Sequence, residues 1–206
     1  MTEEALAFLA EADKTLGGLI ARVGPCRLKP RRRRSPFEAL VQSVVYQQLN
    51  GTVATTILNR VKALYPGRFP TPEDLLSTAD EKLRAAGLSR AKTLAMKDIA
   101  TKTLEGVVPS RKEVTKLSDA ELVERLTVVR GVGPWTVEMF LIFTLGRPDV
   151  FPVTDYGVRK GFSVTYGWKE LPTPKELLAA GEKWRPHRST AAWYFWRALE
   201  IVPPDL

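Results

Sequence analysis

The chain repeats one helix-start pattern at five places, where a hydroxyl side chain is followed three residues later by an acidic residue. These places begin at Ser35, Thr71, Thr78, Ser118 and Thr173, and proline directly follows the first, second and fifth. Such a hydroxyl caps the free N–H groups of a helix, the acidic residue can complete a capping box, and proline fits the first helical position. No segment combines several alternating apolar runs with hairpin turns. The sequence therefore predicts an all-α fold.

The charge balance favours a polyanionic partner. The 206 residues include 31 Lys and Arg against 23 Asp and Glu, a formal net charge of +8. Such a surplus attracts nucleic acid through electrostatic steering and counterion release. Four consecutive arginines occupy positions 31–34. They are either a solvated basic connector or a contact to DNA phosphates.

Several kinds of site are excluded by the small number of cysteines and histidines. Cys26 and His187 are the only residues of their types. One cysteine cannot form an internal disulfide or hold an iron–sulfur cluster, and one histidine makes a histidine-based zinc centre improbable. Residues 1–14 have neither the basic start nor the apolar run of a signal peptide. We expect an intracellular protein that does not enter a membrane.

A glycine-rich turn at residues 130–136 is the most informative local motif. Gly131 and Gly133 bracket one valine, and Pro134 follows at once. Glycines permit a positive φ and close approach of another backbone, while the proline is set to begin a helix. N–H groups at such a helix start form a site for a phosphate oxygen. The same residues also suit a plain helix–helix turn.

The stretch VVRGVGPWTVEMFLIFTLGRPDVFPVTDYGVRKG resembles the helix-hairpin-helix plus Gly/Pro–Asp signature of base-excision DNA glycosylases. Its distinctive element is an aspartate at a set distance from the hairpin, and here Asp155 lies 20 positions after Trp135. The similarity extends over roughly residues 36–200, including VVYQQLNGTVA and AAGLSRAKTLAMK. The nearest branch is 3-methyladenine DNA glycosylase II, in a short form without the N-terminal β-domain of some members.

This resemblance implies a two-lobed all-α glycosylase fold that forms a single unit over residues 1–206. One lobe would span about 36–150 and carry the hairpin, and the other would combine 1–35 with 151–206. The DNA cleft would lie between the lobes. The implied protein is a monomer that binds double-stranded DNA with alkylated bases.

The resemblance assigns the catalytic role to Asp155. Cleavage of a glycosidic bond passes through an oxocarbenium-like state, which a nearby carboxylate stabilises. Local sequence alone favours Asp155 as the cap of the helix that begins near Tyr156, a role that does not exclude catalysis. Members that also nick the strand carry a lysine where this chain has Trp135, so we expect no AP-lyase activity. Neither a required cofactor nor an iron–sulfur cluster is expected.

The base pocket implied by the resemblance is apolar and aromatic. A cationic alkylated purine is attracted to electron-rich ring faces. Met139 stands where some members have an aromatic residue, which leaves the preferred lesion open. Each aromatic residue can also be ordinary core. The expected pocket residues are Trp135, Met139, Tyr156, Trp196 and Gln47.

Further DNA contacts are expected around the hairpin and after the first core helix. Leu49 is the candidate wedge that fills the space left by a flipped base, although it can also be a simple helix-end contact. The other expected DNA-binding residues are Gln48, Lys92, Gly131, Gly133, Thr136 and Arg159. In similar proteins hairpin carbonyls hold an alkali ion, Na⁺ or K⁺, which here implies Thr127, Val129 and Gly131.

Two other functions compete with this interpretation. The first is a non-catalytic helix-hairpin-helix module that binds DNA or damage without cutting a bond. The second is a nuclease or ligase fragment that uses the hairpin only for docking. The latter needs a compact group of metal-binding carboxylates, and the sequence has no such motif.

Overall fold

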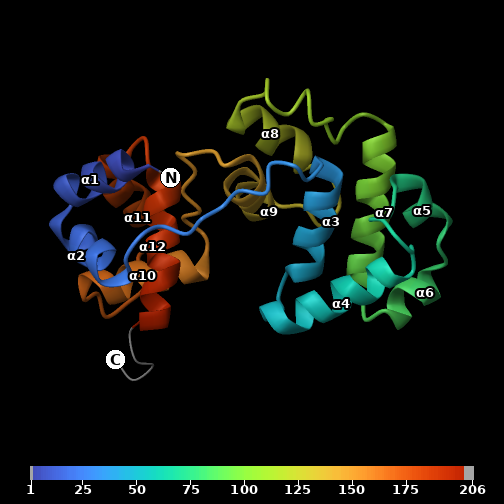
Figure 1. Cartoon of the computed structure of the whole chain (residues 1–206), viewed down its shortest axis with the longest axis horizontal. Helices are drawn as coiled ribbons and strands as arrows, with labels where there is room; N and C mark the ends of the chain where they lie inside the picture. Colours follow the sequence, from blue (N-terminus) through green and yellow to red (C-terminus); the bar gives the residue numbers. More distant parts are fainter. Residues whose placement is uncertain (1, 202–206) are drawn as a thin grey trace. The chain divides into compact units, whose positions relative to one another are not determined.

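The chain folds into helices joined by short loops, as the computed structural model describes for residues 2–201 (Figure 1). The predicted all-α fold is confirmed, because no strand occurs within these residues. The predicted single unit of residues 1–206 includes residue 1 and residues 202–206, which lie outside the residues that the structure describes. The helices divide into two compact units. The first unit combines the residues up to 30 with those from 146 onward, and the second unit comprises residues 31–145.

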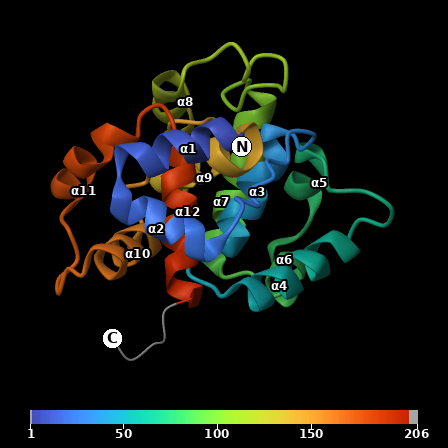
Figure 2. The same ribbon diagram turned by 60° about the vertical axis from the view of Figure 1, so that its left-hand side comes forward.

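The first unit is arranged around its last helix. Its elements are α1 (Glu3–Ala12), α2 (Lys14–Val23), α10 (Tyr156–Tyr166), α11 (Pro174–Ala180), the 3₁₀ helix η2 (Gly181–Trp184) and α12 (Arg188–Ile201). Helix α12 packs along α10 and also contacts α2 and α1, and both views show α10 beside it (Figure 2). The aromatic side chains of Trp184, Tyr194 and Phe195 are fully buried in this unit.

Helices α10 and α12 approach closely because α10 lacks a side chain at the contact. A Cβ placed on Gly161 would lie 1.9 Å from the carbonyl oxygen of Phe195. One turn earlier, a Cβ on Gly157 would lie 2.8 Å from Cδ1 of Trp196. Both distances are far below van der Waals contact. The two glycines therefore set the separation of the helices.

A buried carboxylate joins the start of α2 to α10 and η2. Asp13 is 6% exposed, and its Oδ1 caps α2 by accepting the N–H of Leu16 at 3.1 Å. Its Oδ2 accepts the Tyr166 hydroxyl at 2.5 Å and the Trp184 indole N–H at 3.1 Å, and it pairs with Lys183 at 2.7 Å. Burial raises the pKa of Asp13, but the bonds from Lys183, Tyr166 and its other donors outweigh this and hold the pKa below its ordinary value.

The second unit carries the hairpin. Its elements are α3 (Pro36–Tyr46), α4 (Gly51–Ala63), α5 (Pro72–Ser77), α6 (Asp80–Ala85), α7 (Arg90–Leu104), α8 (Asp119–Leu126), α9 (Pro134–Phe140) and the π-helix η1 (Leu141–Leu145). The apolar face of α3 packs against α7 and α9, and most of its residues are buried. No helix within the described residues combines the length and the apolar character needed to cross a membrane.

Four of the five predicted helix starts are confirmed. Ser35, Thr71, Ser118 and Thr173 each cap a helix through the side-chain oxygen. The prediction for Thr78 is wrong, because its hydroxyl donates back to the carbonyl of Asp74 and the next helix has its N-cap at Ala79.

The capping box expected at Ser35 is also absent. The carboxylate of Glu38 does not return to the Ser35 backbone but pairs with Arg34, at 3.4 Å. Arg34, one residue further from Glu38 than Ser35, offers a charged partner at the i,i+4 spacing, and the carboxylate pairs with it.

The α10–α12 contact predicts opposite effects for two glycine substitutions. Gly161→Ala should lower the free energy of unfolding by about 3 kcal/mol, because the new methyl group overlaps the α12 backbone. Gly18→Ala on α2 has open space around the Cβ and should raise it by about 0.5 kcal/mol, because alanine favours helix. Urea unfolding measures both. Equal effects of the two substitutions would contradict this account of the helix contact.

The Asp13 cluster predicts an acid-dependent contribution to stability. The pKa of Asp13 is lower in the folded chain, so its contribution is present above the ordinary value of 3.8 and lost as the pH falls through the folded pKa. Asp13→Asn should cost about 2 kcal/mol at neutral pH. The difference from wild type should shrink in denaturant titrations as the pH falls below 3.8. A difference independent of pH would show that the charge of Asp13 is not involved.

Candidate functional site

The carboxylate of Asp155 is fixed at the start of α10. Asp155 is the N-cap residue, and its Oδ1 accepts the backbone N–H of Val158 at 2.8 Å. The same oxygen accepts the indole N–H of Trp196, also at 2.8 Å. Two donors from different helices restrict the rotation of this carboxylate. The predicted catalytic residue is therefore held in one orientation at a helix N-terminus, where the helix dipole favours a negative charge.

The residues around Asp155 keep the carboxylate close to an aromatic surface. Gly157 leaves room for the Trp196 ring, since a Cβ there would also come within 3.1 Å of Oδ1 of Asp155. Tyr156 follows the carboxylate directly and is 66% exposed. The structure thus brings Asp155, Tyr156 and Trp196 together within the first unit.

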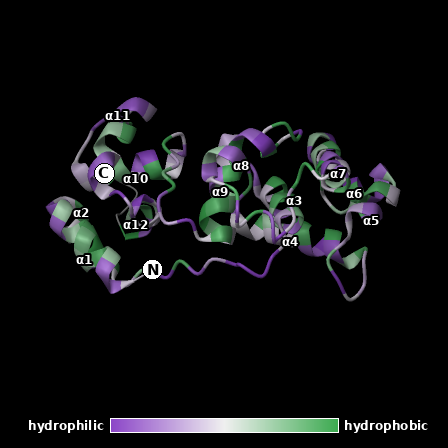
Figure 3. Cartoon of the chain, turned by 90° about the horizontal axis from the view of Figure 1, so that it is seen from above, coloured by the Kyte–Doolittle hydropathy of each residue, from purple (hydrophilic) through white to green (hydrophobic). Residues whose placement is uncertain are grey.

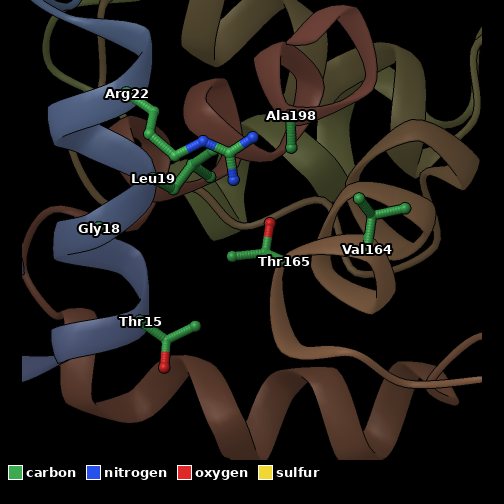
Figure 4. A pocket seen from close by; sticks show the side chains of 7 residues that line it. All are labelled: Thr15, Gly18, Leu19, Arg22, Val164, Thr165 and Ala198. Carbon is green, nitrogen blue, oxygen red and sulfur yellow. The ribbon is translucent and has the colours of Figure 1, made fainter. Parts of the chain in front are cut away.

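The first unit also contains a cavity of about 180 Å³, which is separate from this carboxylate. Figure 4 shows its walls on α2, α10 and α12, with the Arg22 side chain reaching across it. On α10 it is lined by Val164 and Thr165, in the last turn of the helix. Asp155 caps the other end, about 14 Å away at 1.5 Å per residue. The cavity is therefore not the site of the predicted chemistry.

The hairpin runs from α8 to α9 along a path that requires glycine. Gly131 has a φ of 75°, and a Cβ on it would lie 2.8 Å from the Cβ of Ala95 on α7. Gly133 is the N-cap of α9 and offers no side chain to bond the first turn. An oxygen from outside the chain can take the place of that capping side chain.

Gln47 connects the end of α3 to this hairpin. Its Nε2 donates to the carbonyl oxygen of Gly131 and to the hydroxyl of Thr136, each at 2.9 Å. Thr136 is almost completely buried. The structure therefore brings together Gln47, Gly131 and Thr136, which the sequence had assigned to the base pocket and to DNA binding.

The segment from Tyr46 to Leu49 is a tight turn that carries the predicted wedge. Gln47 has φ and ψ of −53° and 132°, Gln48 has a φ of 58°, and the N–H of Leu49 bonds the Tyr46 carbonyl at 3.4 Å. This is a type II turn, in which the third position normally holds glycine or asparagine. Leu49 is 37% exposed at its end. Backbone strain at Gln48 thus lies next to the candidate wedge.

Two of the predicted DNA-binding side chains contact backbone carbonyls of their own unit. The ammonium of Lys92 donates to the carbonyls of Val45 and Gln47, at 2.8 and 2.7 Å. Burial lowers the pKa of Lys92. Nε of Arg159 donates to the carbonyl of Pro172 at 2.8 Å. Each side chain thus stabilises the backbone conformation of its own unit.

The other predicted pocket residues, Trp135 and Met139, lie on α9 in the second unit and are half-buried. Trp135 is the second residue of α9 and Met139 the sixth, and the π-helix η1 follows the helix directly. Spaced four residues apart, they share one face of α9.

The arginine run is anchored to the second unit through its backbone. The N–H of Arg31 bonds the Phe143 carbonyl at 2.8 Å, and the guanidinium of Arg111 reaches the Arg32 carbonyl at 3.2 Å. The segment leading into α3 is purple, hydrophilic, in Figure 3. The side chains of Arg31, Arg32 and Arg33 are exposed, so both interpretations of this run remain predictions.

Comparison with known proteins identifies the family. Residues 41–187 match the HhH-GPD superfamily of base excision DNA repair proteins. The chain is 38% identical to DNA-3-methyladenine glycosylase 1 of Schizosaccharomyces pombe, over 97% of this chain and 92% of that protein. The chain belongs to the HhH-GPD superfamily.

Solved structures of HhH-GPD proteins share its fold. The S. pombe 3-methyladenine DNA glycosylase Mag1 in complex with abasic DNA superposes with a TM-score of 0.90 at 37% identity, covering 97% of this chain and 98% of that one. A DNA-3-methyladenine glycosidase from Bacillus halodurans gives a TM-score of 0.83 at 34% identity, covering 96% and 89%.

Several residues that shape the site of this HhH-GPD protein were missed from the sequence. Asp98 on α7 accepts the backbone N–H of Arg130 in the hairpin at 2.7 Å, although 32 residues separate them. Ala95 sets the space around Gly131. Neither has a local sequence signal. Gly157 and Gly161 do have one, because small residues four apart on a helix allow close helix contact.

The strained turn predicts that replacing Gln48 with glycine stabilises the protein. Gln48→Gly should raise the free energy of unfolding by about 1 kcal/mol, because glycine adopts a positive φ without the steric cost. Asn59→Gly, on the exposed face of α4, should instead lower it by about 0.5 kcal/mol. Thermal or urea unfolding measures both. A Gln48→Gly protein less stable than wild type would show that the turn carries no strain at this position.

Proposed function

We propose that this chain is a monofunctional DNA glycosylase that removes alkylated purines, of the 3-methyladenine and 7-methylguanine type, in base excision repair. The observation that carries the proposal is the Asp155 carboxylate, fixed by Val158 and Trp196 at the position where the family signature has its catalytic aspartate. Similarity to Mag1 over nearly the whole chain supports the same activity.

The proposed reaction is hydrolysis of the bond between the purine N9 and C1′ of the deoxyribose. An alkylated purine carries positive charge, so it leaves with the bonding electrons and becomes neutral. The sugar then has oxocarbenium character, which the negative Asp155 stabilises by electrostatic attraction. Water adds to C1′ and loses its proton, which gives a free base and an abasic site. Trp196 acts as a positioning residue, because its N–H fixes one oxygen of the carboxylate.

The aromatic rings beside the carboxylate favour a cationic base as the substrate. A cationic base needs little acid assistance to leave, and aromatic rings attract it. Tyr156 and Trp196 supply such rings beside the carboxylate, and Trp135 and Met139 are the expected contribution of α9. We propose no lyase step, because Trp135 stands where strand-nicking members have a lysine and so offers no amine for a Schiff base.

The proposed partner is duplex DNA, bound by the monomer in the compartment that holds the cell's DNA. Gly131 and Gly133 would contact a phosphate at the hairpin, while the buried Thr136 would support them through its bond to Gln47. Leu49 with Gln48 would enter the duplex beside the flipped base. Arg159 would support this DNA-binding surface, and Lys92 would do so by holding the turn through the Gln47 carbonyl.

The alkali ion implied for Thr127, Val129 and Gly131 is compatible with the hairpin geometry. The carbonyls of Val129 and Gly131 each accept one internal hydrogen bond, from Val132 and from Gln47. A carbonyl oxygen has a second lone pair, which a Na⁺ or K⁺ ion can use. The ion would neutralise phosphate charge at the hairpin, and the hydrolysis itself requires no cofactor.

The rival function is a non-catalytic module that binds DNA damage. It would need the hairpin and the wedge turn but not a carboxylate oriented by two donors. The Trp196–Asp155 bond therefore favours the enzyme.

The decisive experiment is release of methylated bases from alkylated duplex DNA. Wild type should free methylpurines, and Asp155→Asn should free them at least about a hundredfold more slowly while retaining DNA affinity, because the amide cannot stabilise the cation. Asp80→Asn, in an ion pair on α6, is the control and should resemble wild type. If wild type and both variants bind DNA but none of them releases a base, the protein is the non-catalytic binding module.

A further inference from the structure

We propose that Gln47 couples the turn that carries Leu49 to the hairpin, so that phosphate binding and wedge insertion occur as one event. The inference rests on the proposed function for its DNA substrate. It makes Gln47 a positioning residue, instead of the base-pocket residue that the sequence suggested.

The orientation of the Gln47 side chain is fixed by the chemistry of its partners. The carbonyl of Gly131 can only accept, so the amide must present its NH₂ group to it. The same NH₂ reaches the Thr136 hydroxyl in the first turn of α9. One side chain therefore holds both the glycine of the hairpin and the helix that follows it.

The backbone of the turn is held at the same residue. Lys92 donates to the Gln47 carbonyl and to the Val45 carbonyl two residues earlier. These carbonyls lie at the end of α3, where the helix itself offers no donor. A positive charge at a helix C-terminus is also favourable. The turn is thus held through both the side chain and the main chain of Gln47.

One face of α7 supports the turn and the hairpin together. Lys92 holds the turn, Ala95 abuts Gly131, and Asp98 bonds the N–H of Arg130. A spacing of three residues places these side chains along one side of the helix. Displacement of the hairpin along α7 would therefore also displace the turn that is bonded to it.

The turn needs this support because its conformation is unfavourable in isolation. Gln48 has a positive φ, which side chains other than glycine rarely adopt. The Gln47 bonds hold the turn in this strained form and keep Leu49 exposed at its end. Without them the turn can relax, and Leu49 would lose its position relative to the hairpin.

The test measures wedge insertion without any bond cleavage. The probe is a duplex with a tetrahydrofuran abasic site opposite 2-aminopurine, whose fluorescence rises when stacking is broken. Gln47→Met keeps the length of the side chain but removes both donors. It should weaken the fluorescence response about tenfold in apparent affinity, while binding to undamaged duplex stays within about twofold of wild type because the hairpin's phosphate contacts remain.

Two further variants separate coupling from a general loss of structure. Leu49→Ala should weaken the apparent affinity of the response about tenfold but leave it measurable, and Gln47→Met combined with Leu49→Ala should be no more than about twofold weaker than Leu49→Ala alone, because both act on one event. Thr136→Val removes a Gln47 partner from the hairpin side and should weaken the response in the same direction. Gln42→Met, on α3 but away from the turn, should leave the response unchanged.

The coupling is overturned if Gln47→Met keeps the full response, or if its effect and that of Leu49→Ala are additive. Equal weakening of binding to damaged and undamaged duplex would also overturn it, because Gln47 would then only maintain the fold. The fluorescence signal does not depend on base release. Failure of the proposed glycosylase activity would leave this test intact.

Discussion

The close packing of α10 against α12 is the constraint on which the orientation of the Asp155 carboxylate depends. Val158 donates from the first turn of α10, and Trp196 donates from α12. The Val158 bond is local to the start of α10, whereas the Trp196 bond forms because α10 lies close against α12. Gly157 and Gly161 make that approach possible, since neither position can accept a Cβ. The packing of two helices is therefore also what orients the carboxylate.

The second unit is organised by α7 in a comparable way. This helix supplies an ammonium, a methyl group and a carboxylate, each of which contacts a different part of the turn or the hairpin. The elements expected to touch DNA are therefore short and irregular, but they rest on a regular helix. Such an arrangement allows strain at Gln48 to persist, because the surrounding contacts determine the backbone there.

The sequence predicted the features that depend on local chemistry. The caps at Ser35, Thr71 and Ser118 are read from adjacent residues, and the hairpin from its glycines. The cap at Thr78 was mispredicted because a hydroxyl can equally bond the preceding helical turn. Contacts such as that between Asp98 and Arg130 could not be predicted, because only the folded chain brings such distant positions together.

The central claim is that Asp155 stabilises positive charge on the sugar. An enzyme binds a mimic of its transition state more tightly than a neutral analogue. We would therefore compare binding of duplexes that carry a cationic pyrrolidine abasic analogue or neutral tetrahydrofuran. Wild type should bind the cationic form at least about tenfold more tightly, and Asp155→Asn should lose that preference. Equal affinity of wild type for the two analogues would contradict the account.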